Sequence, residues 1–193
     1  MQRLCVFCGS SFGVDSAYLS VAQALGRLLV EEGIELVYGG GSVGLMGGIA
    51  DAVLEAGGRV TGVIPQALFD KEVGHRNLTD LRIVGSMHER KALMAELSDG
   101  FVAMPGGIGT FEELFEVWTW AQLGYHAKPC SLLNVNGYYD GLSGFLDNVA
   151  ASQFMKPIHR DMLIVEDEPK ALLDRLKSYQ PPAVSKWIGR DER

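Results

Sequence analysis

The stretch Gly100-Phe-Val-Ala-Met-Pro-Gly-Gly-Ile-Gly-Thr-Phe-Glu-Glu113 joins a short apolar run, a glycine turn and the start of a long amphipathic segment. A strand, a glycine turn and a helix in direct succession leave backbone N–H groups pointing outward at the helix N-terminus. Such a turn is a phosphate-binding geometry. Phosphate binding does not require an acid at the far edge of the turn, so Glu113 needs an explanation of its own.

Two earlier segments repeat this pattern, with glycine turns at residues 9–13 and 39–44. Apolar runs predict strands at 4–8, 34–38, 59–64, 81–84, 101–104, 131–135 and 163–165. Amphipathic periodicity predicts helices at 16–32, 45–56, 87–97, 111–123, 139–150 and 169–179. Residues 66–80 show neither period and are predicted to form a long loop.

Strands that are apolar throughout and alternate with helices indicate a parallel sheet covered on both faces. We therefore predict an α/β fold: one Rossmann-like, doubly wound parallel sheet with helices on both faces. A single nucleotide-binding domain would span residues 1–180 and leave 181–193 as a polar tail that can be disordered. In such sheets ligands bind at the carboxyl ends of the strands, where all three glycine turns fall.

The length of 193 residues and the net charge of −7 limit the classes of partner that the protein can have. A nucleic-acid partner needs a basic stripe that releases counterions, so we expect none. Apolar runs stay well short of the ~18 residues of a membrane helix, and the first residues hold too short an apolar stretch for a signal peptide. We expect a cytoplasmic protein with no membrane partner; a small phosphate is compatible with this charge.

The cysteines and histidines show no pattern of a disulfide or a metal site. Cys5 and Cys8 lie on one predicted strand, where residues three apart face opposite sides about 10 Å apart, beyond the ~7 Å that a disulfide tolerates. The four histidines lack metal-binding spacing, and H-E-x-x-H is absent. We expect no metal and no cofactor.

Gly39, Gly41 and Gly44 satisfy G-x-G-x-x-G after a strand and before a helix. An NAD site also needs an acid at the end of the next strand, and that strand carries none. Asp51 and Glu55 fall inside the helix and are expected to be solvated. The motif therefore favours a contact to a mononucleotide phosphate or ribose over NAD.

Arg90 is the unusual residue of the helix predicted at 87–97. Ser86 and Glu89 fit a capping box, which explains Glu89. Arg90 instead falls in the middle of an apolar stripe, where a cation must find an anion or remain as an unpaired buried charge. The alternative is that its side chain extends to solvent. Lys91, at the edge of the stripe, resembles an ordinary surface lysine.

Glu113 has two explanations that the residues alone leave open. Thr110 and Glu113 match a second capping box, and a helix N-terminus favours an acid there. A carboxylate held in this way also stays ionised at pH 7 and is available for catalysis. The helix that follows is apolar over more than half its circumference, which indicates a central position in the core or burial against another subunit.

Three motifs together resemble the Lonely Guy family: G-G-G-x-x-G-L-M-G at 39–47, M-H-E-R-K at 87–91 and P-G-G-x-G-T-x-x-E at 105–113. Its members are cytokinin riboside 5′-monophosphate phosphoribohydrolases, long mislabelled as lysine decarboxylases. The resemblance extends from Cys5 to about Asp147. It implies a modified Rossmann fold, a homodimer, and hydrolysis of an N6-modified adenosine 5′-monophosphate to the free base and ribose 5-phosphate.

Carried over residue by residue, the resemblance implies that Arg90 and Glu113 form the catalytic pair. The expected substrate contacts are Glu72, Arg90, Lys91, Gly106, Gly107, Ile108, Gly109, Thr110, Phe111, Glu112, Glu113 and Thr119. Further candidate nucleotide contacts are Gly9, Ser10, Gly41, Gly44 and Met87.

This assignment agrees with the chemistry of the residues. Cleavage of an N-glycosidic bond builds positive charge on the ribose, which a carboxylate stabilises while it activates water. Arg90 would either bind phosphate or keep Glu113 ionised, and the sequence does not choose between these roles. Whether plain AMP or an N6-prenylated AMP is the substrate is equally open. The non-enzymatic alternative is a nucleotide or cofactor carrier of related fold.

Overall fold

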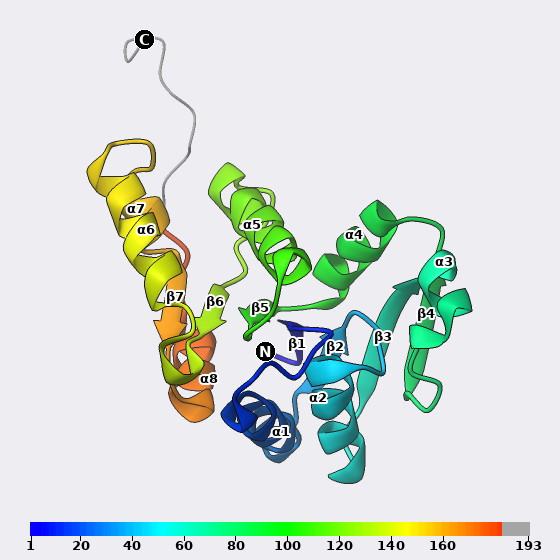
Figure 1. Cartoon of the computed structure of the whole chain (residues 1–193). Coiled ribbons are helices and arrows are strands. Elements are labelled where there is room, and N and C mark those ends of the chain that lie inside the picture. The colour runs from blue at the N-terminus through cyan, green and yellow to red at the C-terminus, as the bar shows by residue number, and fades with distance from the viewer. Residues whose placement is uncertain (183–193) are drawn as a thin grey trace.

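Seven parallel strands form one sheet in the order β4-β3-β2-β1-β5-β6-β7 in the computed structural model, which describes residues 1–182 except the side chains of Glu72 and Val73 (Figure 1). The strands are β1 Arg3–Phe7, β2 Glu35–Tyr38, β3 Val60–Pro65, β4 Asp80–Val84, β5 Gly100–Ala103, β6 Cys130–Leu133 and β7 Leu163–Glu166. The order reverses at β1, which pairs with both β2 and β5. The loops after β1 and β5 therefore diverge and leave the crevice in which ligands of such folds bind.

Helices cover both faces of the sheet, as Figure 1 shows. One layer contains α1 Ser16–Glu31, α2 Gly44–Glu55 and α8 Pro169–Ser178; the other contains α4 Met87–Leu97, α5 Ile108–Leu123, α6 Asp140–Ala151 and α7 Pro157–Arg160. The short elements are α3 Gln66–Leu68, η1 Phe69–Val73, which is one turn of π-helix, and η2 Val135–Gly137. The predicted fold class is confirmed.

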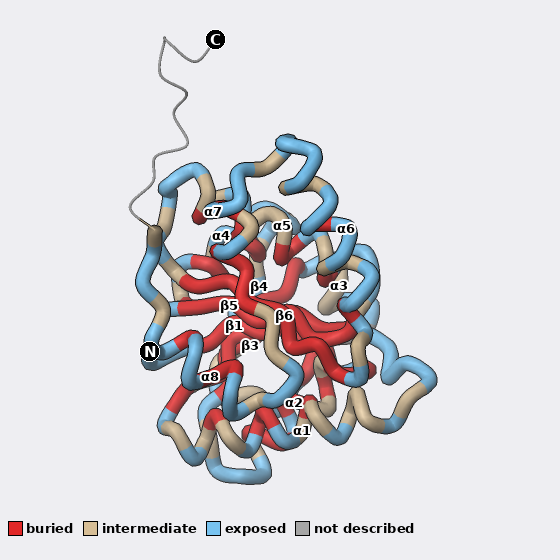
Figure 2. Tube along the Cα trace, turned by 90° about the vertical axis from the view of Figure 1, so that its left-hand side faces the viewer, coloured by how far each residue is buried: buried red, intermediate tan, exposed pale blue. Residues whose placement is uncertain are grey.

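Alternate residues of each strand face opposite helical layers, because side chains on a strand alternate in direction. In β1, Leu4 and Val6 belong to the core under α1 and α2, whereas Cys5 and Phe7 belong to the core under α4 and α5. Figure 2 shows the strands as a buried band between helices with exposed outer surfaces. Cys5 and Cys8 are buried free thiols in different cores, as their spacing predicts.

The structure differs most from the sequence-based expectation at three places, and elsewhere the bounds of the elements shift by one or two residues. Helix α5 begins at Ile108 rather than 111, because its first turn contains Gly109, a poor helix former that reads as part of the turn. The predicted loop 66–80 holds α3 and η1, which are too short to show a period. The one-turn helix α7 was not predicted for the same reason.

Residues 183–193, most of the predicted tail, lie outside the described part of the chain. Among the helices in residues 1–182, none is long and apolar enough to cross a membrane.

Candidate active site

The glycine turn after β5 is held tightly against the loop after β1. The N–H of Gly9 donates to the carbonyl of Pro105 at 3.0 Å, and the Tyr138 hydroxyl donates to the carbonyl of Gly106 at 2.6 Å. A Cβ on Gly106 would lie 2.1 Å from Thr110 Oγ1 and 2.9 Å from the Gly9 nitrogen. Only glycine therefore fits at this position of the observed turn.

Helix α5 starts directly after this turn, with Gly107 as its N-cap. The N–H of Phe111 donates to the carbonyl of Gly107 at 3.1 Å. The N–H groups of Ile108, Gly109 and Thr110 precede that first helical bond and form the positive end of the helix dipole. A Cβ on Gly107 or Gly109 would meet open space, so an anion has room to approach these amides.

Arg90 lies near the start of α4 and points into the sheet. Glu89 N–H donates to Ser86 Oγ at 3.1 Å, which confirms Ser86 as the predicted cap. Glu89 Oε2 accepts from Gly85 N–H at 2.7 Å, one residue before the N–H that a capping box uses. Arg90 is only 8% exposed. Its Nε donates to the carbonyl of Val63 at 3.0 Å and its Nη2 to that of Gly39 at 3.4 Å. The alternative in which Arg90 extends to solvent is therefore wrong.

The anion that Arg90 requires is Glu113. Arg90 Nη1 and Glu113 Oε1 are 2.9 Å apart, and about a tenth of each side chain is exposed. The capping explanation of Glu113 is wrong, because α5 begins at Ile108 and Glu113 falls in its second turn. Burial raises the pKa of Glu113 above the ordinary value for glutamate, and the opposing charge of Arg90 offsets only part of this shift. The pair thus holds a carboxylate that gains a proton more readily than a solvated one.

Lys91 forms a second connection between α4 and α5. Its ammonium contacts Glu112 Oε1 and lies 3.0 Å from Glu116 Oε2, and Lys91 is 6% exposed rather than at the surface as predicted. Burial alone lowers the pKa of Lys91, but the hydrogen bonds to both carboxylates outweigh it and raise that pKa. Glu116 was missed in the sequence; its signal is the i, i+4 spacing from Glu112, which puts both acids on one helix face.

The loops after β1 and β2 contact each other beside the glycine turn. The N–H of Leu45 donates to the carbonyl of Gly9 at 3.0 Å. Gly44 has a positive φ of 59°, and a Cβ on it would lie 2.3 Å from the Ser10 carbonyl carbon. The structure therefore brings Gly9, Ser10 and Gly44, which were predicted to contact the nucleotide, next to the turn at 105–107.

Two predicted residues are not placed at this centre. Thr119 lies on α5 six residues beyond Glu113, about 9 Å along the helix axis, and is exposed. Glu72 is in η1, but its side chain lies outside the described part of the structure. Met87 is half-exposed, with its Sδ 4.0 Å from Arg90 Nη1, and Gly41 is buried in the loop after β2.

Two cavities, at opposite ends of the strands, are candidates for the ligand site. One of about 290 Å³ lies at the sheet reversal between the loops after β1 and β5; it is lined in part by Ser10, Phe12, Tyr18, Gly106 and Tyr138. A larger one, about 470 Å³, lies at the amino ends of β1 to β3, far from the three motifs. The smaller cavity is the better candidate, because it adjoins the helix N-terminus and the carboxyl ends of the strands.

Fold and site together define a Rossmann-like α/β protein with backbone N–H groups at a helix N-terminus beside a buried arginine–glutamate ion pair. Residues 46–176 match the family model described as "Possible lysine decarboxylase". The chain is 53% identical over 180 residues to the probable cytokinin riboside 5′-monophosphate phosphoribohydrolase LOGL9 of Oryza sativa subsp. japonica, covering 93% of this chain and 79% of that protein. It is 48% identical over 180 residues to cytokinin riboside 5′-monophosphate phosphoribohydrolase LOG3 of Arabidopsis thaliana, covering 93% and 84%. The chain belongs to this family, so the resemblance seen in its motifs is confirmed.

Solved structures with this fold include the molybdenum cofactor binding protein of Rippkaea orientalis, with a TM-score of 0.70 and 21% identity over 92% of this chain and 96% of that one. The Moco carrier protein of Chlamydomonas reinhardtii has a TM-score of 0.69 and 21% identity, with the same coverage. At this identity the similarity shows a common fold only.

Proposed function

We propose that the protein hydrolyses the N-glycosidic bond of an adenosine 5′-monophosphate, plain or N6-modified, and releases the base and ribose 5-phosphate. The observation that carries this proposal is the buried Arg90–Glu113 pair, 2.9 Å apart, beside the N-terminus of α5. The plant relatives, named as cytokinin riboside 5′-monophosphate phosphoribohydrolases, support the same reaction.

The amides of Ile108, Gly109 and Thr110 bind the 5′-phosphate in this proposal. They offer donors and the positive end of the α5 dipole at a place with room for an anion. A fixed phosphate also fixes the ribose, so that part of the entropy cost of reaching the transition state is met on binding.

Glu113 then acts on the ribose. Its carboxylate stabilises the positive charge that develops as the glycosidic bond breaks, and it orients or deprotonates the attacking water. Arg90 is engaged by Glu113 and by two backbone carbonyls. This geometry supports a role in keeping Glu113 ionised over direct binding of the phosphate.

The carrier alternative draws on structural neighbours named as molybdenum cofactor proteins. Carriage of a ligand does not require a buried carboxylate positioned by an arginine, whereas stabilising a ribosyl cation and activating water require a positioned carboxylate. The enzyme is therefore the function that we propose.

Product analysis tests the function directly. We expect chromatography to show adenine or its N6-isopentenyl form, with ribose 5-phosphate, after incubation with AMP or N6-isopentenyl-AMP. The matching ribosides lack the phosphate and should react far more slowly, by about 10²-fold or more, because they cannot use the amide cradle. Equal rates for riboside and ribotide would remove the cradle from the mechanism, and binding without any cleavage would favour a carrier.

Gly39 offers a test of the position of Arg90. A Cβ on Gly39 would lie 1.9 Å from Arg90 Nη2, so Gly39→Ala must displace the guanidinium. We expect kcat to fall by about tenfold or more, because displaced catalytic groups lose alignment, while circular dichroism shows a folded protein. Gly141→Ala is the matched control, since a Cβ there meets open space. Full activity in Gly39→Ala would show that the position of Arg90 does not matter.

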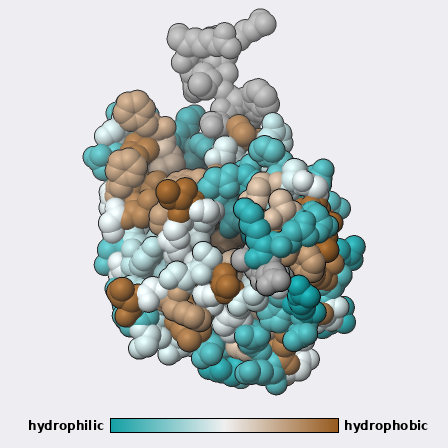
Figure 3. Space-filling model, turned by 45° about the vertical axis from the view of Figure 1, so that its right-hand side comes forward, coloured by the Kyte–Doolittle hydropathy of each residue, from teal (hydrophilic) through white to brown (hydrophobic). Residues whose placement is uncertain are grey.

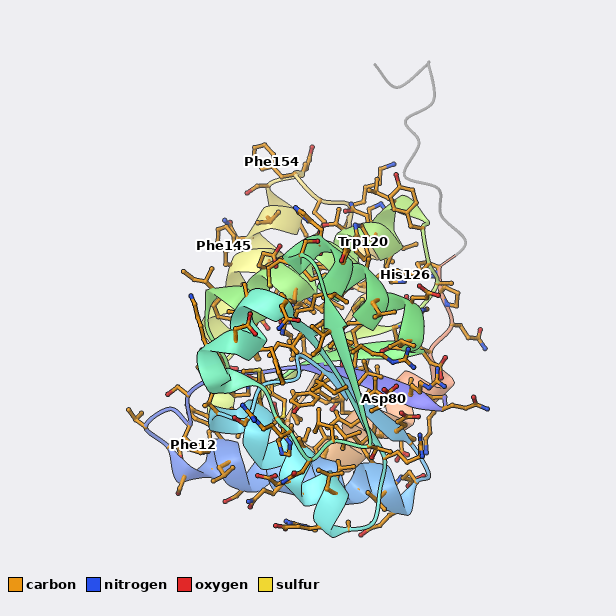
Figure 4. The ribbon with its side chains drawn as sticks, turned by 90° about the vertical axis from the view of Figure 1, so that its right-hand side faces the viewer. Phe12, Asp80, Trp120, His126, Phe145 and Phe154 are labelled. Atoms are coloured by element: carbon orange, nitrogen blue, oxygen red, sulfur yellow. The ribbon has the colours of Figure 1, made fainter. Side chains whose placement is uncertain are left out.

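We also propose a cytoplasmic homodimer. An apolar groove between α5 and α6 is lined in part by Phe115, Trp118, Thr119 and Phe154. Phe154 is 89% exposed and Phe145 61%, and both project outward in Figure 4. In Figure 3 hydrophobic surface gathers at the upper left, whereas the right-hand side is mostly hydrophilic. The free buried cysteines are consistent with a reducing compartment.

Light scattering tests the dimer. We expect a mass of about twice the 21.0 kDa of the chain, and a shift toward that of one chain in Phe154→Asp, because a charge in an apolar interface is costly. Val14→Asp replaces another exposed apolar residue, away from the groove, and should leave the mass unchanged. A wild-type mass near 21.0 kDa at micromolar concentration would contradict the proposal.

A further inference from the structure

The segment between β3 and β4 leaves the sheet at Pro65 and returns to the glycine loop that follows β2. Gly74 and Gly41 form an antiparallel bridge, and the N–H of His75 donates to the carbonyl of Gly40 at 2.8 Å. The returning segment is thus joined to the loop at two consecutive residues.

The side chain of His75 fixes this junction to α2. It is 9% exposed, and its Nε2 lies 2.9 Å from Asp51 Oδ1. The N–H of Asn77 donates to His75 Nδ1 at 3.3 Å, which requires an unprotonated Nδ1. His75 Nε2 therefore carries the proton and donates a hydrogen bond to Asp51 Oδ1. Asp51 is 58% exposed, as expected for a solvated residue, but one of its oxygens has a defined partner.

The same junction encloses the two backbone acceptors of Arg90. One is the carbonyl of Gly39, next to Gly40, which accepts from His75; the other is that of Val63, within β3. The glycine loop also lies directly on β3, since a Cβ on Gly40 would be 3.1 Å from Ile64 Cβ. Arg90 thus occupies a fork between the loop after β2 and strand β3, and the His75 junction ties the β2 side of that fork to α2.

We infer that the Asp51–His75 pair is a positioning pair for Arg90: it holds the loop 39–41 so that the guanidinium meets both carbonyls and Glu113. The expected effect of this pair on turnover rests on the proposed function of Arg90. Its effect on the position of the guanidinium does not. Neither residue touches the site where we place the substrate.

Three variants separate positioning from simple stabilisation. His75→Ala removes both ring contacts, and His75→Gln restores an N–H donor toward Asp51. His126→Ala is a matched control, because His126 Nε2 is likewise 2.9 Å from its acceptor, the Val117 carbonyl, and its Nδ1 accepts from Lys128 N–H. His126 lies just beyond the end of α5 (Figure 4), away from the fork.

The first readout needs no turnover: hydrogen exchange of the Arg90 Nε–H, followed by ¹⁵N NMR and assigned by its loss in Arg90→Lys. We expect at least about tenfold faster exchange in His75→Ala, near-normal exchange in His75→Gln and no change in His126→Ala, since a protected N–H exchanges only when its local structure opens. Unchanged exchange in His75→Ala would overturn the inference.

The second readout is turnover of AMP or N6-isopentenyl-AMP. We expect kcat in His75→Ala to fall by about tenfold, with KM little changed and recovery in His75→Gln, because Arg90 loses alignment while the phosphate cradle is intact. If kcat of His75→Ala stays normal while its Arg90 N–H exchanges faster, the pair holds Arg90 without any effect on catalysis. The part of the inference that concerns turnover is then refuted. If the wild type shows no turnover but Arg90 responds, the proposed function fails and the positioning stands.

Discussion

Glu113→Gln should lower kcat on the order of 10²-fold or more, the usual loss when a catalytic carboxylate is neutralised. Glutamine keeps the shape of the side chain and an oxygen that accepts from Arg90 Nη1, which lies 2.9 Å from the carboxylate in the wild type. It cannot stabilise a ribosyl cation or take a proton from water.

The folding cost of this change should be measurable but tolerable. Glutamine leaves the buried Arg90 cation without its anion, and breaking a buried ion pair in this way costs about 3–5 kcal/mol. Because a domain has ~5–15 kcal/mol of stability, the variant should still fold, as urea denaturation will measure. Glu96→Gln, at an exposed position on α4, is the control and should match the wild type in turnover. Near-normal kcat in Glu113→Gln would move the chemistry to another residue.

Arg90→Met should lose about 10²-fold or more in activity at pH 7, comparable to the loss of one preorganised electrostatic partner. The loss should depend on pH. Burial raises the pKa of Glu113 and Arg90 counteracts it, so removing the cation raises that pKa further. The active form is the carboxylate. The acid limb of the pH–rate profile should therefore move to higher pH, with part of the activity returning above it.

This pH dependence distinguishes the two roles that the sequence left open for Arg90. If Arg90 instead bound the phosphate, its loss would raise KM at every pH, and alkaline conditions would restore little. Arg82→Met serves as the control, because Arg82 is exposed on β4 and pairs only with Asp80 among the described residues. Turnover that is low at every pH with normal KM would contradict both roles.

The layers of the fold were predictable because the inner strands are apolar on both faces, a pattern that leaves a covered parallel sheet as the consistent arrangement. Arg90 was recognisable for a related reason: a cation within an apolar stripe must find an anion. Its partner was not predictable from local spacing, because Glu113 lies 23 positions later, on another helix, and packing of α4 against α5 decides which acid it meets.

Other features of the site were hidden by local rules that tertiary structure overrides. The match of Thr110 and Glu113 to a capping box was misleading, since Gly107 caps α5 instead. Lys91 had the pattern of a surface lysine because Glu112 and Glu116, which allow its burial, belong to a different helix. His75 and Asp51 are 24 positions apart, and no sequence period connects them.

The proposed phosphate cradle consists of main-chain N–H groups at the start of α5, and this bears on how such a protein can change over time. A side-chain anchor disappears with one codon change, whereas an amide is present in every residue except proline. Phosphate recognition of this kind is inherited with the shape of the turn. Residues that meet the other end of a nucleotide can then diversify while the anchor persists, so new substrates arise within one group of compounds, those that carry the phosphate.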